Sequence, residues 1–565
     1  MFGSFKKLCA LCLTLCLLSS VTMGQTKNVL LQAITEELNR SFDILKKKGS
    51  VPPYFMSYRV SDIQSTTISA AYGALQTSET DRTRVLDTSI RVGDYQFDNT
   101  RQTRGVGGNA EILPIDDDPD AIKSMMWMKT DLVYKSAVEQ LFQAKNDRET
   151  SVAEQFPAAD FSHELPQTSS NKEVSLTVDK ALWEKKIKQF SSLFKKYPLI
   201  YLSSVSLSAE ATNNYFVSTE GTSLQHGSTQ ARIVVVASTK ADDGMDLFRF
   251  ETFEAFNIEG LPDNAKITAS IEQVAKDLMA LRKAPFIEPY TGPAILSGRA
   301  SGVFFHEIFG HRIEGHRQKS EFEGNTFTAK INQAVLPAFI SVADDPTLKK
   351  YINTDLSGYY EFDDEGVKAQ KVPLVQSGIL KNFLMSRSPI KGFEKSNGHG
   401  RAQPGTGAVS RQGNLIVQAT KTVTKAELRR LLIAEIKKQG KPFGLLFDDI
   451  SGGFTNTSRA APQAFQVTPI MVYKVFPDGR PDELVRGVDL IGTPLTAFSK
   501  IVAADDSPEV FNGICGAESG LVPVSAVSPG VLISQIEVQK RAKSKELSPI
   551  LPPPGVELNL WKEKK

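Results

Sequence analysis

Three of the six histidines fall within one short stretch, Phe305–Arg317, which reads Phe-His-Glu-Ile-Phe-Gly-His-Arg-Ile-Glu-Gly-His-Arg. Glu307 follows His306 directly, and His311 lies five positions after His306. Imidazole nitrogens are common zinc ligands, and a carboxylate beside a metal site can act as a general base. The stretch therefore predicts metal-assisted hydrolysis, although such a pattern alone is more often incidental than catalytic.

The spacing of five sets a condition on the local backbone. On a regular α-helix, five positions rotate by ~500°, so the two rings would point ~140° apart and could not share one ion. One extra residue absorbed as a π-bulge would realign them, and such bulges occur at functional sites. Gly310, beside His311, would ease the distortion. The spacing thus predicts a π-bulged helix that begins near Arg299.

The cysteines of the chain indicate which residue could join the two histidines as a third metal ligand. Lys6 and Lys7 precede the apolar run Leu8–Leu18, which is too short to span a bilayer and predicts an export signal cleaved near Gly24–Gln25. An uncleaved anchor is the alternative. Cleavage would remove three of the four cysteines and leave Cys515 without a disulfide partner.

A catalytic zinc typically has three protein ligands and an open fourth position. Cys515 is the leading candidate for the third ligand, because a thiolate is a preferred zinc ligand. Asp, Glu and His316 are rivals, and Cys515 could instead be a buried inert residue. Glu314 is expected to be a charge on the exposed face of the helix.

Charge and composition exclude some classes of protein. With 66 Lys+Arg and 64 Asp+Glu, the net charge of +2 gives no basic field for nucleic acid. No segment after the signal is apolar enough to cross a membrane. The chain is therefore expected to be exported to the periplasm or the medium, with no membrane contact beyond the signal peptide.

Periodicity predicts an α+β fold: a mixed N-terminal α/β domain, then a β-rich C-terminal catalytic domain that carries the metal-binding helix. A Pro- and Gly-rich stretch at 284–293 suggests the boundary. We expect a signal peptide at 1–24, an N-terminal domain at 25–286, a C-terminal domain at 287–547 and a Pro-rich tail at 548–565. Helices are expected at Asn28–Lys48, Asp118–Lys145, Asp179–Phe194, Ala265–Lys283 and Thr424–Lys438.

The residues of several stretches resemble the TldD/PmbA family of metallopeptidases. Ser301–Gly315 is similar to the family's metal helix, whose histidines also lie five apart. Gly513-Ile-Cys-Gly516 and Val522-Pro-Val-Ser525 are similar to its late cysteine block, and Asp363–Gly366, Val375–Lys381 and Gly487–Gly492 are further matches. The resemblance covers most of the mature chain and is strongest from Pro293 to Val538.

This resemblance implies a zinc ion on His306, His311 and Cys515, with Glu307 as general base. It also implies unfolded or short peptides as substrates and a dimer, either of this chain or with a related one. An extended peptide could then add to a sheet edge near the metal, and we look for that edge at Ser451–Thr455, with Gly452 and Gly453 in contact with substrate.

Two points keep alternatives open. His316 stands where the family usually has an acidic residue, so it could be an extra ligand, a substrate contact or neutral. The chain could also be a non-catalytic peptide-binding or modulator subunit with a structural zinc, a metal-free modulator, or a hydrolase with Cys515 as nucleophile. Asp363–Gly366 is expected to be a solvated turn.

Overall fold

The fold is described from a computed structural model, which covers residues 28–101, 109–150, 158–319, 323, 326–455, 457, 465–542, 549 and 551. The expected signal peptide at 1–24 and almost all of the expected tail at 548–565 lie outside the described residues. Among the described helices, none is long and apolar enough to cross a membrane.

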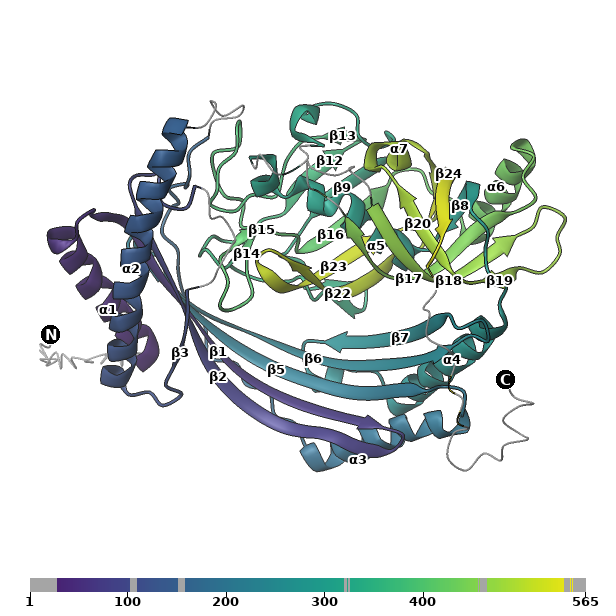
Figure 1. The fold of residues 1–565 in the computed structure, drawn as a ribbon, viewed down its shortest axis with the longest axis horizontal. Helices are drawn as coiled ribbons and strands as arrows, with labels where there is room; N and C mark the ends of the chain where they lie inside the picture. The colour runs from purple at the N-terminus through teal and green to yellow at the C-terminus, as the bar shows by residue number, and fades with distance from the viewer. Residues whose placement is uncertain are drawn as a thin grey trace, which may run out of the picture.

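The N-terminal part is built on one long, curved sheet (Figure 1). Its strands run in the order β3-β2-β1-β5-β6-β4, and β7 pairs with β6. Antiparallel hairpins join β1 to β2 and β5 to β6, so the sheet forms largely from neighbours in sequence. The elements are α1 (Val29–Lys48), β1 (Pro53–Ala71), β2 (Ala74–Val92), β3 (Ala110–Leu113), α2 (Pro119–Thr150), β4 (Thr168–Ser170), α3 (Lys180–Ser192), β5 (Leu202–Ser218), β6 (Ser223–Lys240), β7 (Asp246–Ala255) and α4 (Asn264–Lys283).

Helices cover this sheet in two places. α1 and α2 pack on β1 and β2 at one end, where Leu30, Ile34 and Leu38 of α1 enter a core with Met126 and Leu141 of α2. α3 and α4 pack on the other end. Figure 1 shows the C-terminal elements above the sheet and α3 below it. The sheet thus forms a platform on which the C-terminal part sits.

The C-terminal part has two larger sheets with a helix between them. One sheet runs β13-β12-β9-β16-β23-β22, and the other runs β17-β8-β24-β20-β18-β19. The elements are β8 (Tyr290–Leu296), α5 (Gly298–Ile308), β9 (Ile340–Asp344), β10 (Lys350–Tyr351), β11 (Thr354–Asp355), β12 (Val372–Gln376), β13 (Ile379–Leu380), β14 (Gly400–Arg401), β15 (Val409–Ser410), β16 (Asn414–Ala419), α6 (Lys425–Lys438), β17 (Gly444–Thr455), β18 (Phe465–Val475), β19 (Glu483–Val485), β20 (Val488–Gly492), α7 (Pro494–Ser499), β21 (Ile501–Ala504), β22 (Glu509–Ala517), β23 (Gly520–Ser528) and β24 (Val531–Lys540).

α5 is buried around almost its whole circumference. Ala300, Val303, Phe304 and Ile308 all lie in the main C-terminal core. A helix that is apolar on every side is stable only inside a protein. Its position between the sheets therefore fixes the residues that it carries.

The α+β class and the five helices expected from periodicity are confirmed to within a few residues, although α2 continues to Thr150. The expectation of a solvated turn at Asp363–Gly366 is wrong: Asp363 is only 4% exposed. Its carboxylate accepts hydrogen bonds from the backbone of Glu365, Val367 and Gly400. The proposed division at 286/287 remains a prediction about independent folding.

Candidate metal centre

The first histidine is set in place by the N-terminal half of α5. The Ser297 hydroxyl caps the helix by accepting from the Ala300 backbone N–H. A Cβ at Gly302 would lie 3.1 Å from the Ala526 backbone oxygen, so the glycine lets α5 pack closely on β23. Buried hydroxyls of Ser301 and Ser528 also bond at 2.8 Å. His306, 4% exposed, is therefore held against β23 and its hairpin partner β22.

The prediction of a π-bulge between the histidines is wrong. α5 ends at Ile308, and a separate 3-10 turn runs from Gly310 to Ile313. A Cβ at Gly310 would lie 1.9 Å from the Gln412 side-chain oxygen, so a close approach demands glycine there. The Gln412 amide in turn donates to the His306 backbone oxygen at 3.3 Å. The helix end, not a bulge, turns His311 back toward His306.

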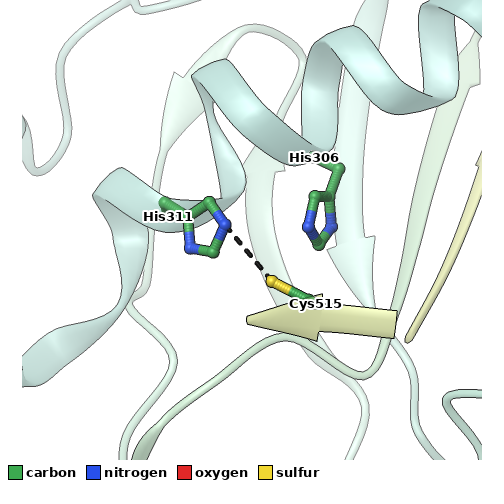
Figure 2. Close-up of side chains that lie close together, drawn as sticks. All are labelled: His306, His311 and Cys515. Carbon is green, nitrogen blue, oxygen red and sulfur yellow. Dashed lines mark hydrogen bonds between the residues drawn. The ribbon is translucent and has the colours of Figure 1, made fainter. Parts of the chain in front are cut away.

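Cys515 completes a compact group of three buried side chains (Figure 2). It lies on β22, where it pairs with Val522 of β23. Its Sγ is 3.4 Å from His311 Nε2, and the two imidazole rings lie 5.1 Å apart at 75°. One ligand atom from each of His306, His311 and Cys515 lies within 4.8 Å of the others. Residues more than 200 positions apart in sequence thus converge on one point.

The chemistry of these donors fits a zinc ion. Imidazole nitrogens and thiolates are both common zinc ligands, and a catalytic zinc typically has three protein ligands. Burial alone would raise the pKa of the Cys515 thiol, but His311 and His306 lower it well below its usual value. The buried Nδ1 atom of His306 has no hydrogen-bond partner. These residues can hold the metal that the resemblance implies.

Glu307 lies beside this group and faces a cavity of about 460 Å³. Burial raises its carboxyl pKa, while the two histidines partly offset the rise. The Gly453 backbone hydrogen-bonds the Glu307 carboxylate, and a Cβ at Gly453 would lie 3.0 Å from Glu307 Cγ. A raised pKa suits a group that must accept and then return a proton.

The cavity brings together six of the seven predicted site residues: His306, Glu307, His311, Gly452, Gly453 and Cys515. Its wall includes both charged and apolar side chains. The charged residues are Arg317, Glu323 and Glu518, and Phe511 and Val524 are apolar. The remaining candidate, His316, does not line this cavity, but its Nε2 hydrogen-bonds Glu518 of the wall.

Glu314 was missed by the sequence reasoning. The expectation of an exposed helix-face charge is wrong, because Glu314 is fully buried. Its carboxylate lies 3.1 Å from His311 Nδ1 and 2.8 Å from Arg317 Nε. Burial alone would raise its pKa, but His311 and Arg317 lower the pKa to about 2. Glu314 is thus a carboxylate that orients His311 with Nε2 toward Cys515.

Arg411 connects the two sides of the centre and was also missed. It is completely buried, with Nε 3.7 Å from Glu314 and Nη2 donating to the Cys515 backbone oxygen at 2.8 Å. One side chain therefore contacts both the carboxylate behind His311 and the strand of Cys515. Nothing in the sequence near position 411 signals this role, since it depends on a contact across the fold.

The C-terminal part of the chain is similar to parts of known proteins. Residues 289–540 match the family model described as the PmbA/TldA metallopeptidase C-terminal domain. A protein of Archaeoglobus fulgidus named a metalloprotease is 30% identical over 239 residues, which are 42% of this chain and 51% of that one. A protein of Saccharolobus solfataricus named a zinc metalloprotease TldD homolog is 22% identical over 329 residues, covering 57% and 68% of the two chains.

A solved structure shares the fold. A Thermotoga maritima protein described as a modulator of a DNA gyrase superposes with a TM-score of 0.60 at 15% identity, over 89% of this chain and 99% of that one. The fold and site thus define a two-part α+β protein with a candidate three-ligand metal centre in its C-terminal part. Its C-terminal part, residues 289–540, is a domain of the TldD/PmbA family. The chain spans only about half of the Archaeoglobus relative that it matches.

Proposed function

We propose that this chain is an exported zinc-dependent metallopeptidase that hydrolyses peptide bonds of unfolded or short peptides. The observation that carries the proposal is the convergence of His306, His311 and Cys515 within 4.8 Å, with Glu307 beside them in an open cavity. A structural zinc site is usually closed by four protein ligands, whereas three ligands leave a position for water or substrate.

In this proposal each residue has a defined task. His306, His311 and Cys515 would hold the metal, and a bound zinc ion would supply Lewis acidity toward a water and a peptide carbonyl. Glu307 would accept the proton of the attacking water and return it to the leaving amine. The Gly453 backbone, which hydrogen-bonds the Glu307 carboxylate, would hold that group in position.

Two strand edges at the cavity suit an extended peptide. β22, which carries Cys515, pairs with β23 only and forms the edge of its sheet as far as the structure is described. At residues 452–455, β17 pairs with β18, while its pairing with β8 is confined to 445–447. Peptides that add to such an edge are held by main-chain hydrogen bonds, so recognition would depend little on sequence. Gly452 and Gly453 would contact the substrate there.

Export and assembly are part of the same proposal. The Lys-Lys and apolar run at the N-terminus supports a cleaved signal and a destination in the periplasm or medium. α2 exposes Met128, Leu132 and Phe142, each more than half exposed. Apolar side chains along one helix support a dimer, either of this chain or with a related one. The mass of the mature protein in solution tests this.

The experiment compares the purified mature protein with Glu307→Ala on reduced casein, with products identified by mass spectrometry and zinc measured in both. We expect the wild type to cut, a metal chelator to stop it, and Glu307→Ala to keep its zinc without cutting. If neither protein cuts while both hold zinc, the peptidase proposal fails. The alternative, a non-catalytic peptide-binding or modulator subunit with a structural zinc, would then replace it.

A further inference from the structure

The strand β22 turns one of its two faces toward the metal centre. Cys515 projects from this strand toward the two histidine rings (Figure 2). The register of β22 with β23 is continuous from Glu509 to Ala517, so side chains alternate between the two faces along the strand. Positions 511 and 513 therefore share the face of Cys515.

Position 513 on this face is a glycine, and the ring of Phe511 fills the space beside it. A Cβ at Gly513 would lie 2.7 Å from both Cε1 and Cζ of the Phe511 ring. The ring therefore leans along β22 in the direction of Cys515, over a position that has no side chain. Gly513 and Cys515 are about 7 Å apart along the strand. The ring thus lies close to the candidate metal ligand, and a larger residue at position 513 would displace it.

Phe511 has accessible surface at the metal cavity. Its side chain is partly buried, packs against the C-terminal core, and lines the cavity of about 460 Å³ that Glu307 and Cys515 also line. Ile514, another residue of the wall, is 47% exposed. Covering apolar surface that faces water with another apolar group is favourable. This part of the wall therefore suits an apolar group of a bound ligand.

The charged side chains of the same cavity already pair with one another. Arg317 lies 3.0 Å from Glu323 and 2.9 Å from Glu518. Along the chain, Phe511 comes before Cys515, whereas Glu518 comes after it, at the tip of the β22–β23 hairpin. A charged side chain of a ligand would compete with these ion pairs, whereas an apolar side chain beside Phe511 would leave them intact.

We propose that Phe511 selects an apolar side chain of the peptide substrate, next to the peptide bond that is presented to the metal. A peptide on the edge of β22 would direct alternate side chains to the face that carries Cys515 and Phe511. The side chain beside the Phe511 ring would then belong to a residue within about two positions of that bond. Main-chain hydrogen bonds would supply affinity, and this contact would add a preference at one position. The inference rests on the proposed peptidase function, because it assigns the side chain to that substrate.

The test is calorimetric binding to the zinc-loaded, full mature protein carrying Glu307→Ala, so that binding is measured without turnover. The probes are acetylated and amidated pentaalanine, and the same peptide with a central leucine or a central glutamine. Leucine and glutamine are similar in size but differ in polarity. We expect the leucine peptide to bind about ten-fold more tightly than the other two, because its side chain leaves water when it covers Phe511.

Two variants remove the ring from its place by different routes. Phe511→Ala deletes the ring, and Gly513→Ala displaces it with a Cβ that would otherwise lie 2.7 Å away. Each should abolish most of the leucine preference while the zinc content and the binding of pentaalanine are retained. Phe511→Leu keeps an apolar side chain and should retain part of the preference. Leu521→Ala, the control, removes an exposed apolar side chain of the same hairpin that is not part of the cavity wall, and should change nothing.

Three results would overturn this inference: equal binding of the leucine and glutamine peptides, no binding of any peptide, or a leucine preference that survives both Phe511→Ala and Gly513→Ala. Casein cleavage by the wild type tests the peptidase function separately. Cleavage without a leucine preference would remove this inference and leave the peptidase standing. A leucine preference that depends on Phe511, without cleavage, would support the apolar contact in a peptide-binding subunit.

Discussion

At the scale of single residues, Glu314 is the buried carboxylate on which the geometry of His311 depends. Its hydrogen bond to His311 Nδ1 leaves Nε2 free to face Cys515. Partners of this kind orient metal-bound histidines, and their loss typically lowers metal affinity 10–100-fold. We predict a loss of that order for Glu314→Gln in zinc competition with a chromogenic chelator. Glu361→Gln, on the surface, is the control, and an unchanged zinc affinity for Glu314→Gln would contradict the assignment.

Asp363 makes a prediction about stability and pH. Burial, together with the nearby Glu365, raises the pKa of Asp363 well above its usual value, while hydrogen bonds from backbone N–H groups partly offset the rise. The folded state therefore keeps this proton to higher pH than the unfolded state. The resulting stability is complete below the unfolded pKa of about 3.9 and is lost as pH rises through the folded pKa.

Asp363→Asn should remove this loss of stability with rising pH. In urea unfolding between pH 4 and 8, the free energy of unfolding of the variant should fall less steeply with pH than that of the wild type, by up to about 1.4 kcal/mol per pH unit. The variant should also be less stable at pH 4, because an amide cannot accept all the backbone hydrogen bonds that the carboxyl accepts. If the free energy of unfolding changed with pH in the same way for both proteins, Asp363 would have the same pKa in the folded and unfolded states, which would contradict the prediction.

At the scale of elements, the end of α5 sets the spacing of the two histidines. A Cβ at Gly310 would lie 1.9 Å from Gln412, so Gly310→Ala must displace Gln412 or the 3-10 turn. We predict a loss of about 1–3 kcal/mol of stability from this overpacking, and weaker zinc binding. Gln412→Ala in the same chain makes room and should restore part of both. If Gly310→Ala alone kept the zinc affinity of the wild type, the 3-10 turn would not be the element that positions His311.

How far the elements could be predicted from the sequence depended on which interactions fix them. Amphipathic helices such as α4 are local, so periodicity and a capping side chain such as Asp263 predict them well. The turn after α5 was mispredicted, because a helix with a π-bulge and a helix that stops at Ile308 give the same histidine spacing. The deciding contact, Gln412 against Gly310, joins residues about a hundred positions apart.

The same distinction between local signals and contacts across the fold applies to the candidate site. His306, Glu307 and His311 are conspicuous by spacing, and Cys515 by being the lone cysteine after the expected signal. Glu314 lies in the same motif, but a sequence cannot show whether a carboxylate is exposed or buried. Arg411 and Glu518 have no local signal, because their partners come from other elements. Predicting them requires the fold.

At the scale of the whole molecule, Arg59 joins the N-terminal sheet to the C-terminal part. It lies on β1, is 5% exposed, and pairs with Asp364 across the two parts and with Asp87 on β2. Removing one partner of a buried ion pair leaves uncompensated charge and costs about 3–5 kcal/mol. We predict that loss for Arg59→Ala by chemical unfolding. Arg430→Ala, in a pair on the exposed face of α6, should leave the stability almost unchanged. Equal costs would mean that Arg59 does not hold the two parts together.

The claim on which the whole account rests is that one zinc ion is held by His306, His311 and Cys515. X-ray absorption at the zinc edge, measured on the mature protein, tests it directly. We predict two nitrogen neighbours at about 2.0–2.1 Å and one sulfur at about 2.3 Å. Cys515→Ser should lose the sulfur signal. A wild-type spectrum without sulfur, or one unchanged in Cys515→Ser, would contradict the proposed centre.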